Sequence, residues 1–257
     1  MRIPFVNVSS VISNGNESSL ELDTHADTCA IGKDALIIMD HNRPVNVQGY
    51  DPTLGTKQYQ TASAALAYTH PGTGQVYHLV IHQGIFIPEL DHCLLCPFQC
   101  RVNDIQINDV PKFLTRNPTV ATHSICVPDP DRHDRELYLP LALSGVTSYL
   151  SISKPTVEEF ESGNFARIEL TSLDLTWDPG DTTYATQEDD ITDSHGEIIN
   201  DPAARGPKTL VINSLNSMAV DAADITDDDN FGNVLESNVS PMITFMSTDA
   251  GPEKRVP

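Results

Sequence analysis

Short apolar runs separated by turn residues fill the first third of this 257-residue chain and constrain its fold more than any other feature. In several of these runs apolar residues stand at every second position, which is typical of half-buried strands. Sequences such as Asp-Pro-Thr-Leu-Gly and His-Pro-Gly-Thr-Gly lie between them and favour turns. The runs that predict strands cover residues 4–12, 20–22, 35–39, 45–47, 59–68, 76–82 and 84–87. This succession predicts an all-β domain, either a barrel or a sandwich.

The chain beyond residue 103 carries weaker strand signals and one helix signal. Further strands are predicted at residues 104–108, at 124–127 and within 137–152. Thr156 and Glu159 then form the pattern of a capping box, in which the two side chains bond the free backbone amides of a helix start. This pattern predicts one short helix that runs through Phe160.

Charge divides the chain near residue 154. Residues 1–154 hold 15 acidic and 10 basic side chains, whereas residues 155–257 hold 21 and 5, so most of the net charge of −21 lies in the second part. A segment with so high a charge buries little apolar surface, which predicts a β domain over residues 1–153 and a largely disordered acidic tail over residues 154–257. The acidic surface disfavours direct nucleic-acid binding, and no apolar run approaches the roughly 18 residues of a membrane span. The expected partner is protein.

A carboxylate directly follows the strand at residues 20–22. Asp23, Thr24, His25 and Ala26 end that strand in a turn of polar and small residues. Aspartic proteases present their catalytic Asp in this way, with a hydroxyl residue beside it and small residues after it that let backbone amides approach the carboxylate. Taken alone, the same pattern is also that of an ordinary turn rich in Asp and Thr.

Two motifs in order resemble the retropepsin family, the aspartic proteases of retroviruses and retrotransposons. The first is Asp23 followed by a Gly-flanked hairpin at residues 49–55 and by two further strands. The second is residues 85–101, Ile-Phe-Ile-Pro-Glu-Leu-Asp-His-Cys-Leu-Leu-Cys-Pro-Phe-Gln-Cys-Arg. It is similar to the segment of copia-type elements in which an apolar strand and Pro lead into an Asn-Leu-Leu-Ser helix start. The resemblance covers about residues 15–150.

The resemblance implies a retropepsin-like closed barrel with one short helix, in a homodimer without a cofactor. Asp23 and Thr24 of each chain would form the catalytic site, with Thr24 bonding across the dimer, and Gly49, Tyr50 and Gly55 would form a flap. Two facing carboxylates cannot both ionise, so they would share a proton and activate a water. The implied function is an aspartic endopeptidase that processes its own copia-type LTR retrotransposon polyprotein, in the cytoplasm or in virus-like particles there.

The chain departs from the family pattern at two supporting positions. His25, before Ala26, stands where retropepsins have Gly, and its side chain restricts the backbone angles beside Asp23. His92 stands where the family has an Arg that pairs with an acid, here Asp27, and a His makes a weaker and pH-dependent pair. These departures give the alternative function, a catalytically inactive retropepsin-derived domain that serves assembly or protein binding.

Cysteines give a third alternative. Cys93, Cys96 and Cys100, beside His92, are residue types that bind zinc, which allows a small metal-binding module. Their spacing is not that of the retroviral zinc knuckle and their neighbours are apolar, so buried thiols and no metal are expected. Five cysteines, an odd number, predict reduced thiols rather than disulfides. A second Asp-Ser-His-Gly turn begins at Asp193, but no apolar strand precedes it, so we interpret it as a turn alone.

Overall fold

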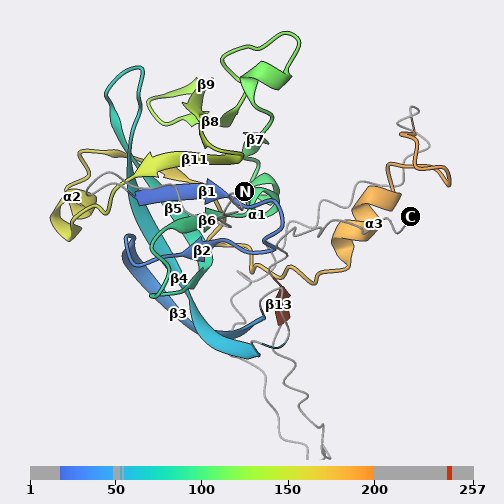
Figure 1. Cartoon of the computed structure of the whole chain (residues 1–257), viewed down its shortest axis with the longest axis horizontal. Coiled ribbons are helices and arrows are strands. Elements are labelled where there is room, and N and C mark those ends of the chain that lie inside the picture. Colours follow the sequence, from blue (N-terminus) through green and yellow to red (C-terminus); the bar gives the residue numbers. More distant parts are fainter. Residues whose placement is uncertain (1–17, 49–52, 54, 200–241, 245–257) are drawn as a thin grey trace, which may run out of the picture. The chain divides into compact units, whose positions relative to one another are not determined.

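The computed structural model describes residues 18–48, 53, 55–199 and 242–244 (Figure 1). The strand predicted at residues 4–12 and the flap positions Gly49 and Tyr50 lie outside the described residues. The described chain forms two compact units. One runs to Leu173 and includes residues 242–244, and the other begins at Asp174.

Two sheets form most of the first unit, so the all-β class predicted from the sequence is confirmed. The ten-stranded sheet has the order β10-β11-β1-β6-β2-β5-β4-β3-β13, and β12 pairs with β5 off this path. Its strands are β1 (Ser18–Leu22), β2 (Ala30–Ile31), β3 (Leu36–Gln48), β4 (Thr56–Thr69), β5 (Val76–Phe86), β6 (Cys93–Leu95), β10 (Ala142–Ser144), β11 (Thr147–Ile152), β12 (Ala166–Glu169) and β13 (Met242–Thr244). The smaller sheet contains β7 (Gln106–Asn108), β8 (Ser124–Asp129) and β9 (Arg132–Pro140), in that order.

The centre of the large sheet is buried on both faces. Residues 61–66 of β4 and residues 77–85 of β5 are buried without interruption, as expected for strands covered on both sides. One continuous core cluster joins the two sheets. Its fully buried large side chains are Leu20, Ile31, Leu66, Leu79, Ile81, Leu95, Ile125, Leu139, Leu150 and Leu170.

The closed barrel expected from the resemblance is wrong, because the large sheet is open. Its two ends are β10 and β13, each three residues long. To close a barrel, the two end strands must pair with each other along their length in a fixed register. Strands of three residues offer little length for such pairing. The long strand β5 also divides its pairing, with β12 beside residues 77–80 and β2 beside residues 85–86, so the sheet branches instead of continuing around a barrel.

Two breaks between predicted strands are in fact irregularities within continuous strands. The segment around Asn42 was expected to separate two strands, but β3 runs through it with a register shift between Asp40 and Pro44. Asn42 takes a positive φ of 52°, and Gln83 takes one of 55° at the corresponding break within β5. Such bulges insert residues without ending the strand, so the sequence predicts a turn where the structure has a bend.

Three α-helices occur in the described residues, where one was predicted: α1 (Pro97–Val102), α2 (Val157–Glu161) and α3 (Thr183–Asp189). The capping box predicted at Thr156 and Glu159 is present at the start of α2. Strand β12 follows α2 and pairs in parallel with β5, so the large sheet includes residues beyond 153. None of the described helices has the length and apolar composition needed to cross a bilayer.

Candidate active site

The two sequence motifs, about 70 residues apart, lie side by side in the sheet. Strand β1, which leads to Asp23, pairs in parallel with β6, which contains Leu94 and Leu95. The backbone amide of Asp23 extends this pairing by donating to the carbonyl oxygen of Leu95 at 3.0 Å. Strand β6 lies between β1 and β2, the two strands that the Asp23 turn connects (Figure 1). The turn is therefore attached to the Leu-Leu segment at its first residue.

Backbone amides hold the Asp23 carboxylate in a defined orientation. Oδ1 accepts hydrogen bonds from the amide of His25 at 2.9 Å and from the amide of Ala26 at 3.2 Å. The side chain is half-buried, and Thr24 beside it is exposed. Hydrogen bonds from two amides to one carboxylate oxygen fix the orientation of the side chain.

His25 does not prevent this arrangement. Its side chain is exposed, and its backbone is not among the described residues that take a positive φ. A negative φ is open to every residue type, so this turn does not require the Gly that retropepsins have here. Ala26 is buried, as expected for a small residue that packs under the turn.

The β3–β4 hairpin holds the flap candidate that lies within the described residues. Its strands pair up to Gln48 and Thr56, which leaves residues 49–55 as the connection. Within it, Gly55 is described and takes a φ of 74°, a left-handed conformation that favours glycine. The flap itself stays a prediction.

His92 bonds its chain neighbour and not the acid that the resemblance implies. Its Nδ1 lies 2.8 Å from Oδ1 of Asp91, and this hydrogen bond lowers the pKa of the Asp91 carboxyl below its ordinary value. His92 is buried, whereas the Asp91 side chain is 65% exposed. Asp27 is half-buried in the turn. The predicted pair of His92 with Asp27 is therefore replaced by a pair of adjacent residues.

The cysteines are buried free thiols. Burial raises the pKa of Cys93 and of Cys96 to about 12, and it also raises the pKa of Cys29. Within the described ranges no three side chains of His, Cys, Asp or Glu are arranged to hold a metal ion. This geometry gives no support to a metal-binding module on Cys93, Cys96 and Cys100.

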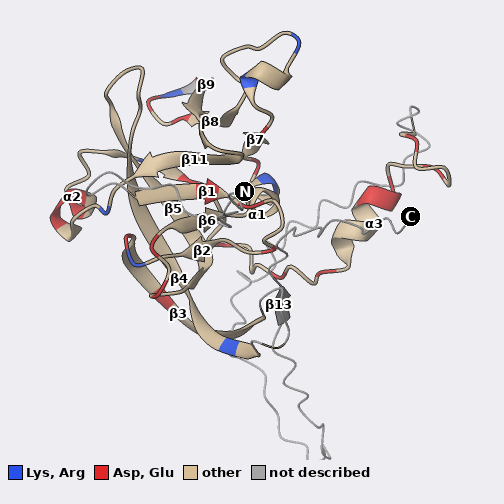
Figure 2. Ribbon diagram, in the orientation of Figure 1, with Lys and Arg blue, Asp and Glu red and all other residues tan. Residues whose placement is uncertain are grey.

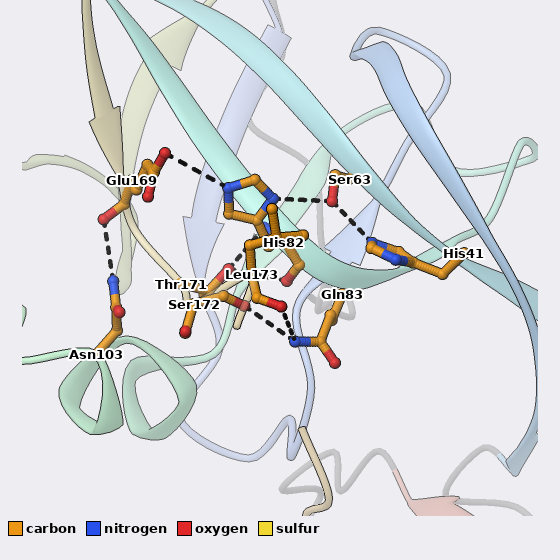
Figure 3. Close-up of polar contacts among 9 residues, drawn as sticks. All are labelled: His41, Ser63, His82, Gln83, Asn103, Glu169, Thr171, Ser172 and Leu173. Carbon is orange, nitrogen blue, oxygen red and sulfur yellow. Dashed lines mark hydrogen bonds and ion pairs between the residues drawn. The ribbon is translucent and has the colours of Figure 1, made fainter. Parts of the chain in front are cut away.

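A polar network that the sequence did not indicate joins β3, β4, β5 and β12 and has Ser63 and His82 buried at its centre (Figure 3). Nε2 of His41 lies 2.8 Å from Oγ of Ser63, and this Oγ lies 2.9 Å from Nδ1 of His82. On the other side of the ring, Nε2 of His82 lies 3.8 Å from a carboxylate oxygen of Glu169. Its members come from four strands far apart in the chain, so no local spacing connects them. The signal in the sequence that could have indicated this network is the presence of a polar residue within each of two long apolar strands, Ser63 in β4 and His82 in β5.

One arrangement of protons satisfies the whole network. His41 donates to Ser63, Ser63 donates to Nδ1 of His82, and the Nε2 proton of His82 faces Glu169. The order Ser, His, Glu is also that of a hydrolase triad, but Ser63 is fully buried and has no surface for a substrate to reach. The network therefore satisfies polar groups at the bulge of β4 between Ala62 and Ala64 and is structural.

Three histidines connect the stability of this fold to pH. Burial is the main cause that lowers the pKa of each, and a nearby basic side chain adds to it. They are His41, His78 and His123. Because their pKa in the folded protein lies below the ordinary 6.5, the unfolded chain binds more protons in acid. Above pH 6.5 all three histidines are neutral and do not oppose folding. The free energy of unfolding decreases as the pH falls below 6.5 and through the pKa values that these histidines have in the folded protein.

We therefore expect the urea midpoint of unfolding to fall when the pH is lowered from 7.5 to 5. His78 is 1% exposed, so His78→Gln should weaken this dependence. The exposed His195 provides the matched control, and His195→Gln should leave it unchanged. A midpoint that is constant or rises on acidification would contradict the expectation.

Charge in the described chain is mostly negative. Figure 2 shows Lys and Arg as isolated positions along the ribbon, whereas Asp and Glu recur in turns and helices. Such a distribution attracts phosphate groups weakly.

The chain matches none of the protein-family models, curated proteins or solved structures with which it was compared. The likeness to retropepsins therefore depends on the two sequence motifs.

Proposed function

We propose that this chain is a retropepsin-like aspartic endopeptidase that acts as a homodimer. The observation that carries the proposal is the Asp23 turn. A half-buried carboxylate follows β1, two amides orient it through Oδ1, and the Leu94–Leu95 strand lies directly beside it. The pairing of β1 with β6 supports the proposal because it brings together the two motifs that resemble the family.

Each chain supplies one Asp23, so the reaction requires two chains with their carboxylates facing. The two carboxylates share one proton because like charges at that separation cannot both ionise. The ionised acid removes a proton from a water, whose oxygen attacks the peptide carbonyl, while the protonated acid donates to the carbonyl oxygen. The tetrahedral intermediate then collapses, the C–N bond breaks, and the amine leaves with a proton from the pair. The exposed Thr24 bonds across the dimer beside this pair.

The proposed substrate is the polyprotein of a copia-type LTR retrotransposon that contains this chain. The β3–β4 hairpin, with Gly55 in its connection, covers the extended peptide during cleavage. The net charge of −21 favours a protein partner over nucleic acid. Processing takes place in the cytoplasm or in virus-like particles, and it requires no cofactor.

A second candidate function is an inactive retropepsin-derived domain that serves assembly or protein binding. The observation that favours it is His25, whose exposed side chain lies next to the carboxylate where the family has Gly. Two chains brought together at Asp23 would bring two imidazoles to the same interface. This candidate predicts dimerisation without cleavage.

The pH profile of cleavage tests the peptidase proposal. We expect a bell-shaped rate for a polyprotein-derived peptide with an optimum below neutral pH, because activity requires one proton shared by two carboxylates. Sedimentation at the same pH values reports whether the dimer is present. Cleavage that increases steadily up to pH 8, or a dimer that cleaves at no pH, would contradict the proposal.

A further inference from the structure

The turn that begins at Asp23 ends at Cys29, and its two ends are held by β6 and by the segment that follows β6. At the first end, the amide of Asp23 donates to the carbonyl oxygen of Leu95 at 3.0 Å. At the second end, the amide of Cys29 donates to Oε1 of Gln99 at 2.9 Å, and the amide of Cys96 donates to Sγ of Cys29 at 3.2 Å. The residues between the ends belong to neither helix nor strand. The hydrogen bonds at its two ends therefore determine how stable the conformation of the turn is.

Gln99 uses both atoms of its side-chain amide. It lies on α1 and is 3% exposed. Its Oε1 accepts from Cys29, and its Nε2 donates to the carbonyl oxygen of His82 at 3.4 Å. These two contacts also fix the orientation of the amide. If the amide were reversed, its NH₂ group would face the N–H of Cys29 and its oxygen would face the carbonyl oxygen of His82, and neither contact could be a hydrogen bond. Gln99 thus connects the Asp23 turn to β5.

The point on β5 that Gln99 contacts is itself firmly held. The Thr171 hydroxyl accepts from the amide of His82 at 2.7 Å and donates to its carbonyl oxygen at 2.8 Å. Ser63 bonds the ring of the same residue (Figure 3). Directly after it, Nε2 of Gln83 donates to the carbonyl oxygen of Ser172 at 3.0 Å. Gln99 therefore attaches the turn to a rigid part of the sheet.

We propose that Gln99 is a positioning residue for Asp23. It fixes the end of the turn whose amides, those of His25 and Ala26, orient the carboxylate. Without the Gln99 amide, the buried amide of Cys29 loses its acceptor, and the turn opens more often. The part of the proposal that concerns catalysis rests on the proposed peptidase function, whereas the part that concerns the turn does not.

Gln99→Met, which keeps the length of the side chain and removes both hydrogen bonds, tests the proposal in the full chain. We expect amide hydrogen exchange at His25, Ala26 and Cys29 to become roughly tenfold faster or more. Exchange in the centre of β4 should stay as in the wild type. In cleavage assays kcat should fall while KM changes little. Gln187→Met, at an exposed position of α3, is the control and should change neither readout.

Gln99→Glu supplies a rescue that depends on pH. A protonated carboxyl can accept from the Cys29 amide and donate to the His82 carbonyl oxygen, as the Gln amide does, whereas an ionised one cannot donate. After correction for intrinsic rates, slow exchange of the turn should return as the pH is lowered. A change in packing alone would not follow pH in this way. If Gln99→Met fails to fold, this pH dependence decides the proposal.

Exchange of the turn that is unchanged in Gln99→Met would overturn the proposal. A wild-type kcat in a variant whose turn exchanges faster would also overturn it. If the wild-type chain cleaves no peptide and the exchange pattern still appears, the peptidase function fails while Gln99 still holds the turn.

Discussion

Asp23→Asn is expected to reduce cleavage by roughly 1,000-fold or more, because an amide can neither share the proton of the pair nor accept one from water. The fold should be retained, since Oδ1 of Asn can still accept from the amides of His25 and Ala26. The measurement is the initial rate of peptide cleavage at mildly acidic pH, together with urea unfolding of the same samples.

Asp91→Asn is the matched control for this substitution. Asp91 is an exposed carboxylate that bonds His92, so its replacement removes a charge of the same kind outside the proposed site. We expect this variant to cleave at close to the wild-type rate. Cleavage by Asp23→Asn at the rate of the Asp91→Asn control would place the catalytic group elsewhere.

Leu95→Ala is expected to lower the free energy of unfolding by about 2–5 kcal/mol, because it leaves a cavity in the main core. Leu95 is fully buried in the strand beside Asp23. Leu143→Ala removes the same atoms from the edge strand β10, where the side chain is 37% exposed, and should cost much less. Urea unfolding of both variants gives the comparison. Equal losses would show that the β1–β6 contact is not part of the core.

Much of the fold could be predicted from local pattern. The alternation of apolar residues locates β1, β4 and β5, and Thr156 with Glu159 locates α2. The breaks were harder to predict, because polar residues such as Asn42 and Gln83 signal a turn equally well when a bulge continues the strand. The strand pattern allows a barrel or a sandwich, and the resemblance favours the closed barrel, whereas the open sheet follows from long-range pairing.

The candidate site was predictable at Asp23 and less so around it. A carboxylate after a strand is a local pattern, and the structure gives it two backbone donors. The partner of His92 was not predictable, because the resemblance indicates Asp27 while the nearer Asp91 bonds the ring. Gln99 has no sequence signal, since its two partners lie 70 and 17 residues away in the chain.

Lowering the pH is expected to have opposite effects on the stability of the fold and on the proposed cleavage reaction. The lowered pKa values of His41, His78 and His123 make the folded chain less stable in acid. A pair of carboxylates that shares a proton is active in acid and loses that proton as the pH rises. We therefore expect that part of the loss of cleavage at low pH is caused by unfolding of the chain. A bound ligand stabilises the folded chain, so it should shift this loss to lower pH.

Mixtures of wild-type and Asp23→Asn chains test most directly whether two Asp23 carboxylates form one site. The chains are unfolded together, refolded at constant total concentration and assayed at saturating substrate. If both carboxylates are required, activity follows the square of the wild-type fraction, so equal amounts give about a quarter of the wild-type activity. Activity that falls in direct proportion to the wild-type fraction, with half remaining in the equal mixture, would show that one Asp23 suffices and would contradict the dimeric dyad.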